Sequence, residues 1–156
     1  MVMVDKLSTM NIKNTKQKQQ IMVIYNTPDK HEPLNDSLKL DGYDIIIAVD
    51  EDEALNMLNI IQPDMVILDT VTADAHTLHI LDAVKHKSDV PVVIITPDIE
   101  IGTLKEIFKH GADDIVYRPL NMRSLIAQIH AIMRRWYHFH KVLFTKGKRL
   151  HRPFIS

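Results

Sequence analysis

The segment DMVILD, residues 64–69, sets four consecutive apolar residues between two aspartates. An apolar run without alternation is typical of a strand that is buried on both faces, as in a parallel sheet covered by helices. Four further segments have the same character, namely IMVIY (21–25), DIIIAV (44–49), VPVVIIT (90–96) and DIVY (114–117). Together they predict the five strands of a parallel sheet.

Helical patterns with capping signals fall between these runs. Asp50 with Glu53, Asp74 and Asn121 each predict a helix start, and Gly111 predicts a helix end. The expected inward-facing residues are Ala54, Leu58 and Ile61, then Leu78, Leu81 and Val84, then Ile101, Leu104, Ile107 and Phe108, and in the last helix Met122, Leu125, Ile126, Ile129, Ile132 and Met133. The first helix is the weakest, because Pro33 breaks it or starts it late.

The order of elements is therefore (βα)5. Right-handed crossovers between parallel strands then give an α/β fold, a doubly wound five-stranded parallel sheet with helices on both faces. A chain of 156 residues suits one such domain. We expect a polar, disordered N-terminal tail over residues 1–19, the domain over residues 20–137, and a basic C-terminal tail over residues 138–156, or a linker to an output domain.

Composition narrows the classes of protein. The chain has no cysteine, which excludes disulfides and thiolate metal sites. No apolar run approaches the roughly 18 residues needed to cross a bilayer, and the N-terminus has no signal-peptide core. We therefore expect a cytoplasmic protein without membrane contact. The nine histidines are interpreted as scattered surface residues, because no third ligand stands at a recognised metal-binding spacing.

Charge is distributed unevenly along the chain. Residues 1–114 hold ten Lys/Arg and all twenty acids, whereas residues 115–156 hold nine Lys/Arg and no acid. Such a distribution can steer an anionic partner, although a solvated helix face followed by a basic tail explains it equally well. We expect no nucleic-acid binding except through the basic tail.

Polar residues follow several of the predicted strands. They are Tyr25 and Asn26, Asp69, Thr96 and Arg118. In open α/β sheets, ligands bind outside the carboxyl ends of the strands. A carboxylate, a hydroxyl and a guanidinium at this edge form a set that can handle phosphate, and ordinary loop residues are the alternative interpretation.

The order PDMVILD, VPVVIIT and GADDIVYRP resembles the receiver domain of bacterial two-component response regulators, over about residues 20–136. The resemblance implies the flavodoxin-like receiver topology with strand order 2-1-3-4-5. It also implies Mg²⁺-dependent phosphoryl transfer from a histidine kinase to Asp69. Thr96 is then the residue that turns toward the phosphoryl oxygen, and Arg118 stands where the family has a lysine that pairs with it.

The departures from this family lie at the reaction centre. Tyr25 and Asn26 replace the two acids that hold magnesium, so we expect weak or absent Mg²⁺ binding, no cofactor and no enzymatic activity. Arg118 can clamp Asp69 directly, and Tyr25 can fill the vacated metal volume. The alternative is that Asp29 supplies the lost acid. Ile115 stands where the family usually has its switch aromatic.

We therefore interpret the chain as an atypical receiver, or pseudo-receiver, that acts in signal transduction through protein–protein contacts. Two alternatives remain. One is a working phosphoacceptor that a histidine kinase phosphorylates on Asp69, and the other is the regulatory half of a DNA-binding transcriptional regulator. The expected partner is a histidine kinase or a downstream effector.

The resemblance also indicates an interface. In the winged-helix class of regulators, the face made by the helix predicted around residues 101–108, the strand at 114–117 and the last helix carries acids that pair with basic residues. Asp113, Asp114 and Arg135 match that pattern. Ser124 and Gln128 replace charges usually found at this face. A homodimer through this face can therefore be held by the remaining charges, or by apolar packing through Ile101 or Leu104.

Overall fold

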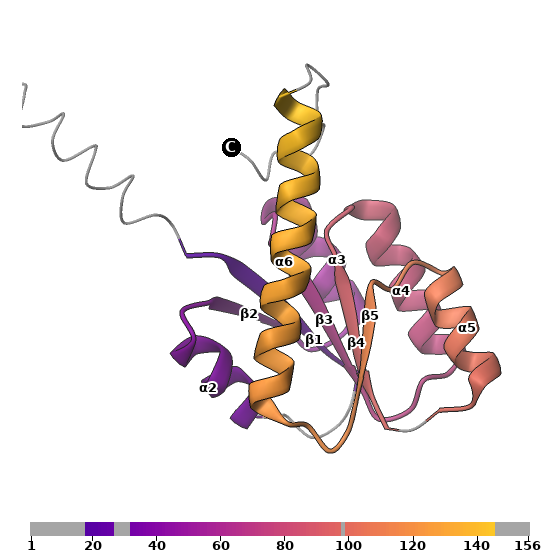
Figure 1. Ribbon diagram of the computed structural model, residues 1–156. Helices are drawn as coiled ribbons and strands as arrows, with labels where there is room; N and C mark the ends of the chain where they lie inside the picture. The colour runs from indigo at the N-terminus through magenta and orange to yellow at the C-terminus, as the bar shows by residue number, and fades with distance from the viewer. Residues whose placement is uncertain (1–17, 27–31, 98, 146–156) are drawn as a thin grey trace, which may run out of the picture.

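Five parallel strands form one sheet in the computed structural model, which describes residues 18–26, 32–97 and 99–145 (Figure 1). The strands are β1 Gln20–Asn26, β2 Asp44–Ala48, β3 Met65–Thr70, β4 Val92–Thr96 and β5 Asp114–Tyr117. Their order in the sheet is β2-β1-β3-β4-β5. The predicted fold class and strand order are therefore confirmed.

Helices alternate with the strands and cover both faces of the sheet (Figure 1). They are α2 Glu32–Leu40, α3 Glu51–Ile60, α4 Ala75–Lys87, α5 Ile101–Lys109 and α6 Met122–Thr145. Residues of α2 and α6 pack in one core cluster, and residues of α3, α4 and α5 pack in the other. The helices thus form two layers with the sheet between them.

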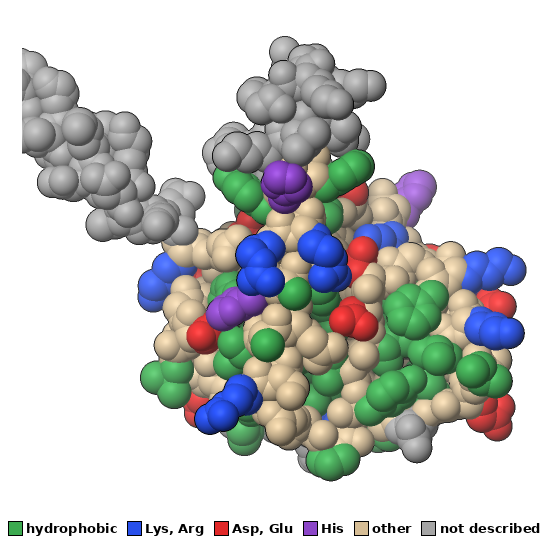
Figure 2. All heavy atoms as spheres, viewed as in Figure 1, with side chains coloured by type: hydrophobic (Ala, Val, Ile, Leu, Met, Phe, Trp, Pro, Cys, Tyr) green, Lys and Arg blue, Asp and Glu red, His purple; other side chains and the backbone are tan. Residues whose placement is uncertain are grey.

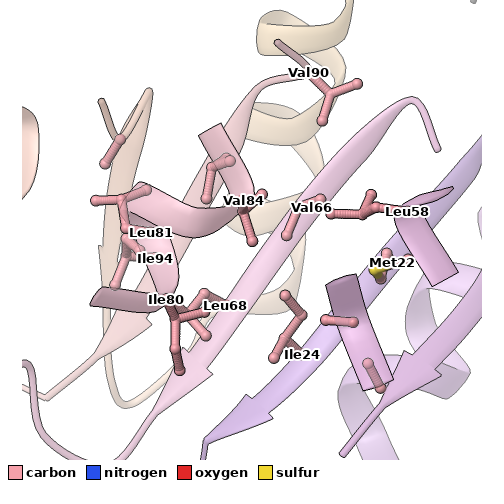
Figure 3. Packing of buried hydrophobic residues seen from close by; sticks show 14 of the residues in the cluster. Met22, Ile24, Leu58, Val66, Leu68, Ile80, Leu81, Val84, Val90 and Ile94 are labelled. Carbon is pink, nitrogen blue, oxygen red and sulfur yellow. The ribbon is translucent and has the colours of Figure 1, made fainter. Parts of the chain in front are cut away.

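Alternation along each strand divides the core between these two layers. In β1, Ile21 and Val23 belong to the cluster under α2 and α6, whereas Met22 and Ile24 belong to the cluster under α3, α4 and α5. Figure 3 shows Met22, Ile24 and Leu58 in the second cluster. Because side chains of a strand point alternately to opposite faces, apolar residues at consecutive positions fill both layers, which is why the runs show no alternation.

The predicted helix starts are present. The Asp50 side chain accepts a hydrogen bond from the Glu53 backbone N at 2.8 Å, and Asp74 forms a reciprocal capping box with Thr77. The Asn121 side chain accepts from the Ser124 backbone N at 3.0 Å. Each side chain satisfies N–H groups that have no partner within the helix.

The first helix begins late, as the second of the two expectations for Pro33 had it. α2 starts at Glu32, and Pro33 is therefore in its first turn, where a missing N–H costs no helical hydrogen bond. Gly111 follows α5 with a positive φ of 109°, a conformation that glycine adopts without steric penalty. The end of α5 thus falls where the sequence placed it.

Some predicted core residues are not buried. Ile101 is 69% exposed and Phe108 is 45% exposed, so these two expectations for α5 were wrong. Ile107 is the buried residue of this helix and packs in one cluster with Ile94 of β4 and Ile115 of β5, the edge strand of the sheet. Ile61 and Leu78 are half-buried, Ile61 because it lies just past the end of α3.

The last helix is much longer than the strands it covers. Its 24 residues correspond to about 36 Å at 1.5 Å per residue, whereas a five-residue strand spans about 17 Å. Its C-terminal end projects beyond the sheet (Figure 1), and the helix passes the predicted boundary at residues 137/138 without a break. No helix in the described part of the chain is both long and apolar enough to span a membrane.

Parts of three predictions lie outside the described residues. They are most of the N-terminal tail, the C-terminal tail beyond residue 145, and Asp29. The predicted domain boundaries therefore stay predictions.

Candidate functional site

The carboxyl edge of the sheet brings together the polar residues that the sequence singled out. Asp69 lies near the end of β3, with Tyr25 of β1 beside it on one side and Ile95 of β4 on the other. Thr96 closes β4, and Arg118 follows the last residue of β5. Parallel strands end at the same edge, so residues far apart in sequence become neighbours here.

Asp69 and Arg118 form an ion pair. The Arg118 Nη2 atom donates a hydrogen bond to Asp69 Oδ1 at 2.5 Å. The Asp69 side chain is fully buried and the Arg118 side chain is 23% exposed. A buried carboxylate is stable only when it is paired and hydrogen-bonded, so the guanidinium compensates a charge that the fold has removed from water.

The backbone holds Arg118 in place for this contact. Its N–H donates to the Thr96 carbonyl oxygen at 3.0 Å, which continues the pairing of β5 with β4 by one residue. The next peptide bond, to Pro119, is cis. The strand end therefore fixes the starting point of the arginine side chain and directs it toward β3.

Tyr25 is part of the core on the side of α2 and α6 and is 3% exposed. Its hydroxyl donates a hydrogen bond to Asn35 Oδ1 at 2.8 Å. Asn35 belongs to α2 and is 7% exposed. The tyrosine therefore ties the end of β1 to α2.

Sequence analysis did not single out Asn35. The available signal was its place on α2 directly after the buried Leu34, where a polar side chain faces inward and needs a hydrogen-bond partner. For Asn26, the structure describes the backbone, which pairs with Thr70.

Thr96 is fully buried, and within the described residues its Oγ1 atom has no hydrogen-bond partner. The loop after β3 is held by other hydroxyls. Thr70 Oγ1 donates to the Thr72 carbonyl at 2.6 Å, and Thr77 Oγ1 donates to the same carbonyl at 3.1 Å. Among the described residues, the buried Thr96 hydroxyl thus lacks the kind of hydrogen bond that the hydroxyls of Thr70 and Thr77 form.

Among the described residues, no hydrogen bond or ion pair joins the three interface candidates to one another, and two of them serve the fold. Asp113 Oδ2 accepts from the Val92 backbone N at 2.7 Å and from Lys85 Nζ at 3.2 Å. Asp114 Oδ2 accepts from Gln128 Nε2 at 3.3 Å. Arg135 is exposed on α6. Their assignment as interface residues stays a prediction.

Comparison with known families gives a match to the response regulator receiver domain over residues 21–130. A probable transcriptional regulator ycf27 from Porphyridium aerugineum is 29% identical over 119 residues, which cover 76% of this chain and 50% of that protein. A protein of the same description from Guillardia theta is 29% identical over 76% of this chain and 46% of its own length. The chain thus spans about half the length of these curated relatives.

Solved structures show the same fold. A two-component response regulator from Clostridium difficile superposes with a TM-score of 0.69 at 24% identity, covering 76% of this chain and 98% of its own. NtrX from Brucella abortus gives a TM-score of 0.72 at 25% identity, over 81% of this chain and 29% of its own. The similarity to NtrX therefore concerns one part of a longer protein.

Proposed function

Since this chain belongs to the response regulator receiver domain family, we propose that it is an atypical receiver that signals through protein contacts without Mg²⁺-dependent phosphorylation. The observation that carries the proposal is the ion pair between buried Asp69 and Arg118. The partner is a histidine kinase or a downstream effector in the cytoplasm, and a second copy of the chain is a further candidate.

The donors at this edge do not fit a divalent ion. Magnesium is usually held in proteins by one or two carboxylates together with waters and substrate oxygens. Here the Asp69 carboxylate already binds a guanidinium, and the Tyr25 hydroxyl donates to Asn35. In the described part of the chain, no group of three or more His, Asp or Glu side chains is arranged to hold a metal. A fixed cation beside Asp69 also repels a second one.

The same pair opposes phosphoryl transfer. Enzymatic phosphoryl transfer depends on positioning and on neutralising charge with metal ions and cationic side chains. Asp69 must release at least part of its contact with Arg118 before an oxygen can attack phosphorus. Without a metal beside it, the same Arg118 would have to neutralise both Asp69 and the incoming phosphoryl oxygens. The ion pair therefore favours one conformation of the edge, which partners recognise directly.

Intact-mass analysis tests this proposal. The chain is incubated with a small-molecule phosphodonor and Mg²⁺, and we expect no species that has gained a phosphoryl group. The Asp69→Asn variant is the matched control. A phosphorylated species in the natural chain that disappears in this variant contradicts the proposal.

A restored variant shows that the assay can detect the reaction. Tyr25→Asp, Asn26→Asp and Arg118→Lys together return the acids and the lysine that the family has at these positions. Provided that circular dichroism shows a folded chain, we expect this variant to gain Mg²⁺ binding and a phosphoryl group on Asp69.

One observation favours the alternative of a working phosphoacceptor. The Thr96 hydroxyl is buried and has no hydrogen-bond partner among the described residues, which leaves it available to a phosphoryl oxygen. A Mg²⁺ titration followed by NMR separates the two functions. Saturable shifts of the amides around Asp69 support the alternative, and their absence supports the atypical receiver.

The names of the curated relatives favour a role in transcription. Both are described as probable transcriptional regulators, and this chain matches about half of each. As a second candidate, the chain is the regulatory half of a DNA-binding regulator. Retardation of duplex DNA that fades steeply with salt supports contact through the basic tail, and no retardation at low salt argues against it.

A further inference from the structure

A small hollow lies beside α6 at the amino edge of the sheet, opposite the edge that carries Asp69. We call it the Tyr43 hollow. Its lining residues are Gln19, Tyr43, His130, Met133, Arg134 and Tyr137, and its volume is about 210 Å³. Sites for small molecules and cofactors usually measure about 300–1,000 Å³. The hollow is therefore better suited to one inserted side chain than to a cofactor.

One face of α6 supplies most of the lining. His130, Met133, Arg134 and Tyr137 follow the spacing i, i+3, i+4 and i+7, which places them on one side of a helix. Met133 is buried against the domain, while Tyr137 is 52% exposed. The hollow thus begins on the body of the domain and continues onto the projecting end of α6.

Two contacts of His130 hold one side of the Tyr43 hollow in place. His130 Nε2 lies 2.7 Å from Asp41 Oδ2, which joins α6 to the turn before β2. The ring of Tyr43 lies 6.1 Å from that of His130, and Tyr43 is 5% exposed. Burial and the neighbouring Asp41 carboxylate raise the pKa of Tyr43 to about 12, so its phenol adds no negative charge to the hollow.

The projecting end of α6 combines exposed apolar surface with positive charge. Phe139 is 59% exposed, and Arg134, Arg135 and His138 are exposed as well. The sequence of α6 contains four Lys/Arg and no acid, and no acid occurs anywhere in residues 115–156. In Figure 2, blue side chains lie on the upper part of α6 with green side chains close by.

We propose that the Tyr43 hollow and the adjoining end of α6 form a docking site for an acidic segment of a partner protein, which inserts an apolar or aromatic side chain between Tyr43 and Tyr137. The apolar side chain fills the hollow, and the acidic residues meet Arg134 and Arg135. Buried aromatic contacts supply most of the binding energy in such sites, while complementary charge supplies specificity and rate.

The other occupants fit less well. A second copy of α6 brings the same unbalanced positive charge to the contact, so like charges face each other. Duplex nucleic acid satisfies the arginines but leaves the hollow and the exposed aromatic side chains without a role. The site lies at the opposite edge from Asp69, so the inference does not depend on whether Asp69 is phosphorylated.

Selection from a random peptide library displayed on phage tests the proposal on the full chain. We expect the enriched peptides to carry Asp or Glu around a Leu, Phe or Trp. Selected peptides should shift the NMR amide signals of Gln19, Tyr43 and Met133. Arg134→Glu and Tyr137→Ala should each weaken binding about tenfold, which corresponds to about 1.4 kcal/mol.

Arg123→Glu is the matched control, because it reverses the same charge at an exposed position near the other end of α6. It should change the affinity less than twofold. The proposal is overturned if no peptide is enriched, if the enriched peptides lack acids, or if Arg123→Glu weakens binding as much as Arg134→Glu. It is also overturned if sedimentation shows a dimer that Tyr137→Ala dissociates, because the occupant is then a second copy.

Discussion

This domain has two kinds of ion pair, one at the carboxyl edge of the sheet and the other on its surface. Asp69 is fully buried and is paired with Arg118, whose side chain is 23% exposed. Some of the surface pairs join a histidine to a carboxylate, as in His110 with Asp82 and His130 with Asp41, and others join a lysine to a carboxylate, as in Lys85 with Asp113. The hydrogen bond to Asp82 raises the pKa of His110 above its usual value.

The two regions differ in how strongly pH and salt affect their ion pairs. A buried pair is costly to break, because the partner left behind is a charge without water. An exposed pair contributes little on its own and responds to pH and salt. The pair at the carboxyl edge is therefore the more costly one to break, whereas the exposed pairs are more sensitive to the solution around them.

Removing the arginine is expected to have the largest effect on the stability of the domain. Arg118→Ala leaves the Asp69 carboxylate buried without its cation, and we expect a loss of about 3 kcal/mol in the free energy of unfolding, the lower end of the range because Arg118 is partly exposed. Urea denaturation measures it. Asp69→Asn combined with Arg118→Ala should recover part of the loss. A single variant within about 1 kcal/mol of the natural chain would show that the pair does not matter for stability.

Removing the tyrosine hydroxyl has a smaller expected effect at the same edge. Tyr25→Phe keeps the ring in the core but leaves Asn35 Oδ1 buried without this donor. We expect a loss of about 1–2 kcal/mol, measured by urea denaturation. Tyr117→Phe is the matched control, because Tyr117 is 39% exposed and should change stability by less than about 0.5 kcal/mol. Equal effects for the two variants contradict the role given to Asn35.

The smallest expected effect belongs to a surface pair and depends on pH. The hydrogen bond between His110 and Asp82 is the main cause of the raised pKa of His110, and Glu106 raises this pKa further. A pKa raised in the folded state contributes stability that is present below the unfolded value of about 6.5 and is lost as pH rises through the folded pKa.

We therefore expect stability to fall slightly as pH rises above about 6.5, and His110→Gln to reduce that fall. Urea midpoints across this range and NMR titration of the His110 ring provide the measurements. Asp82→Asn should act like His110→Gln. A His110 pKa at or below the ordinary value argues against the assignment.

The sequence predicted the fold well because its strands are buried on both faces. Runs such as 65–68 and 92–95 are apolar at every position and are buried by the two helical layers, and capping side chains mark where the helices begin. Ile101 and Phe108 were misplaced because a periodic apolar pattern does not reveal that a helix lies at the edge of the sheet. Burial at an edge depends on tertiary position.

The candidate site was predicted in part. The strand ends identified Asp69 and Arg118 as neighbours, since parallel topology brings them to one edge. Asn35 was missed because its contact with Tyr25 depends on how α2 approaches the sheet, and Pro33 obscured where that helix begins. Contacts between strand ends follow from topology, whereas contacts between a strand and a helix depend on packing.

The unbroken course of α6 has a mechanical consequence. A straight helix turns as one body, so any rotation that repacks Ile129 against the sheet appears at Phe139 with the same angle. A small adjustment inside the domain is thereby carried well past the sheet to side chains that touch solvent. α6 can thus transmit a rotation from the interior of this domain to whatever binds its far end.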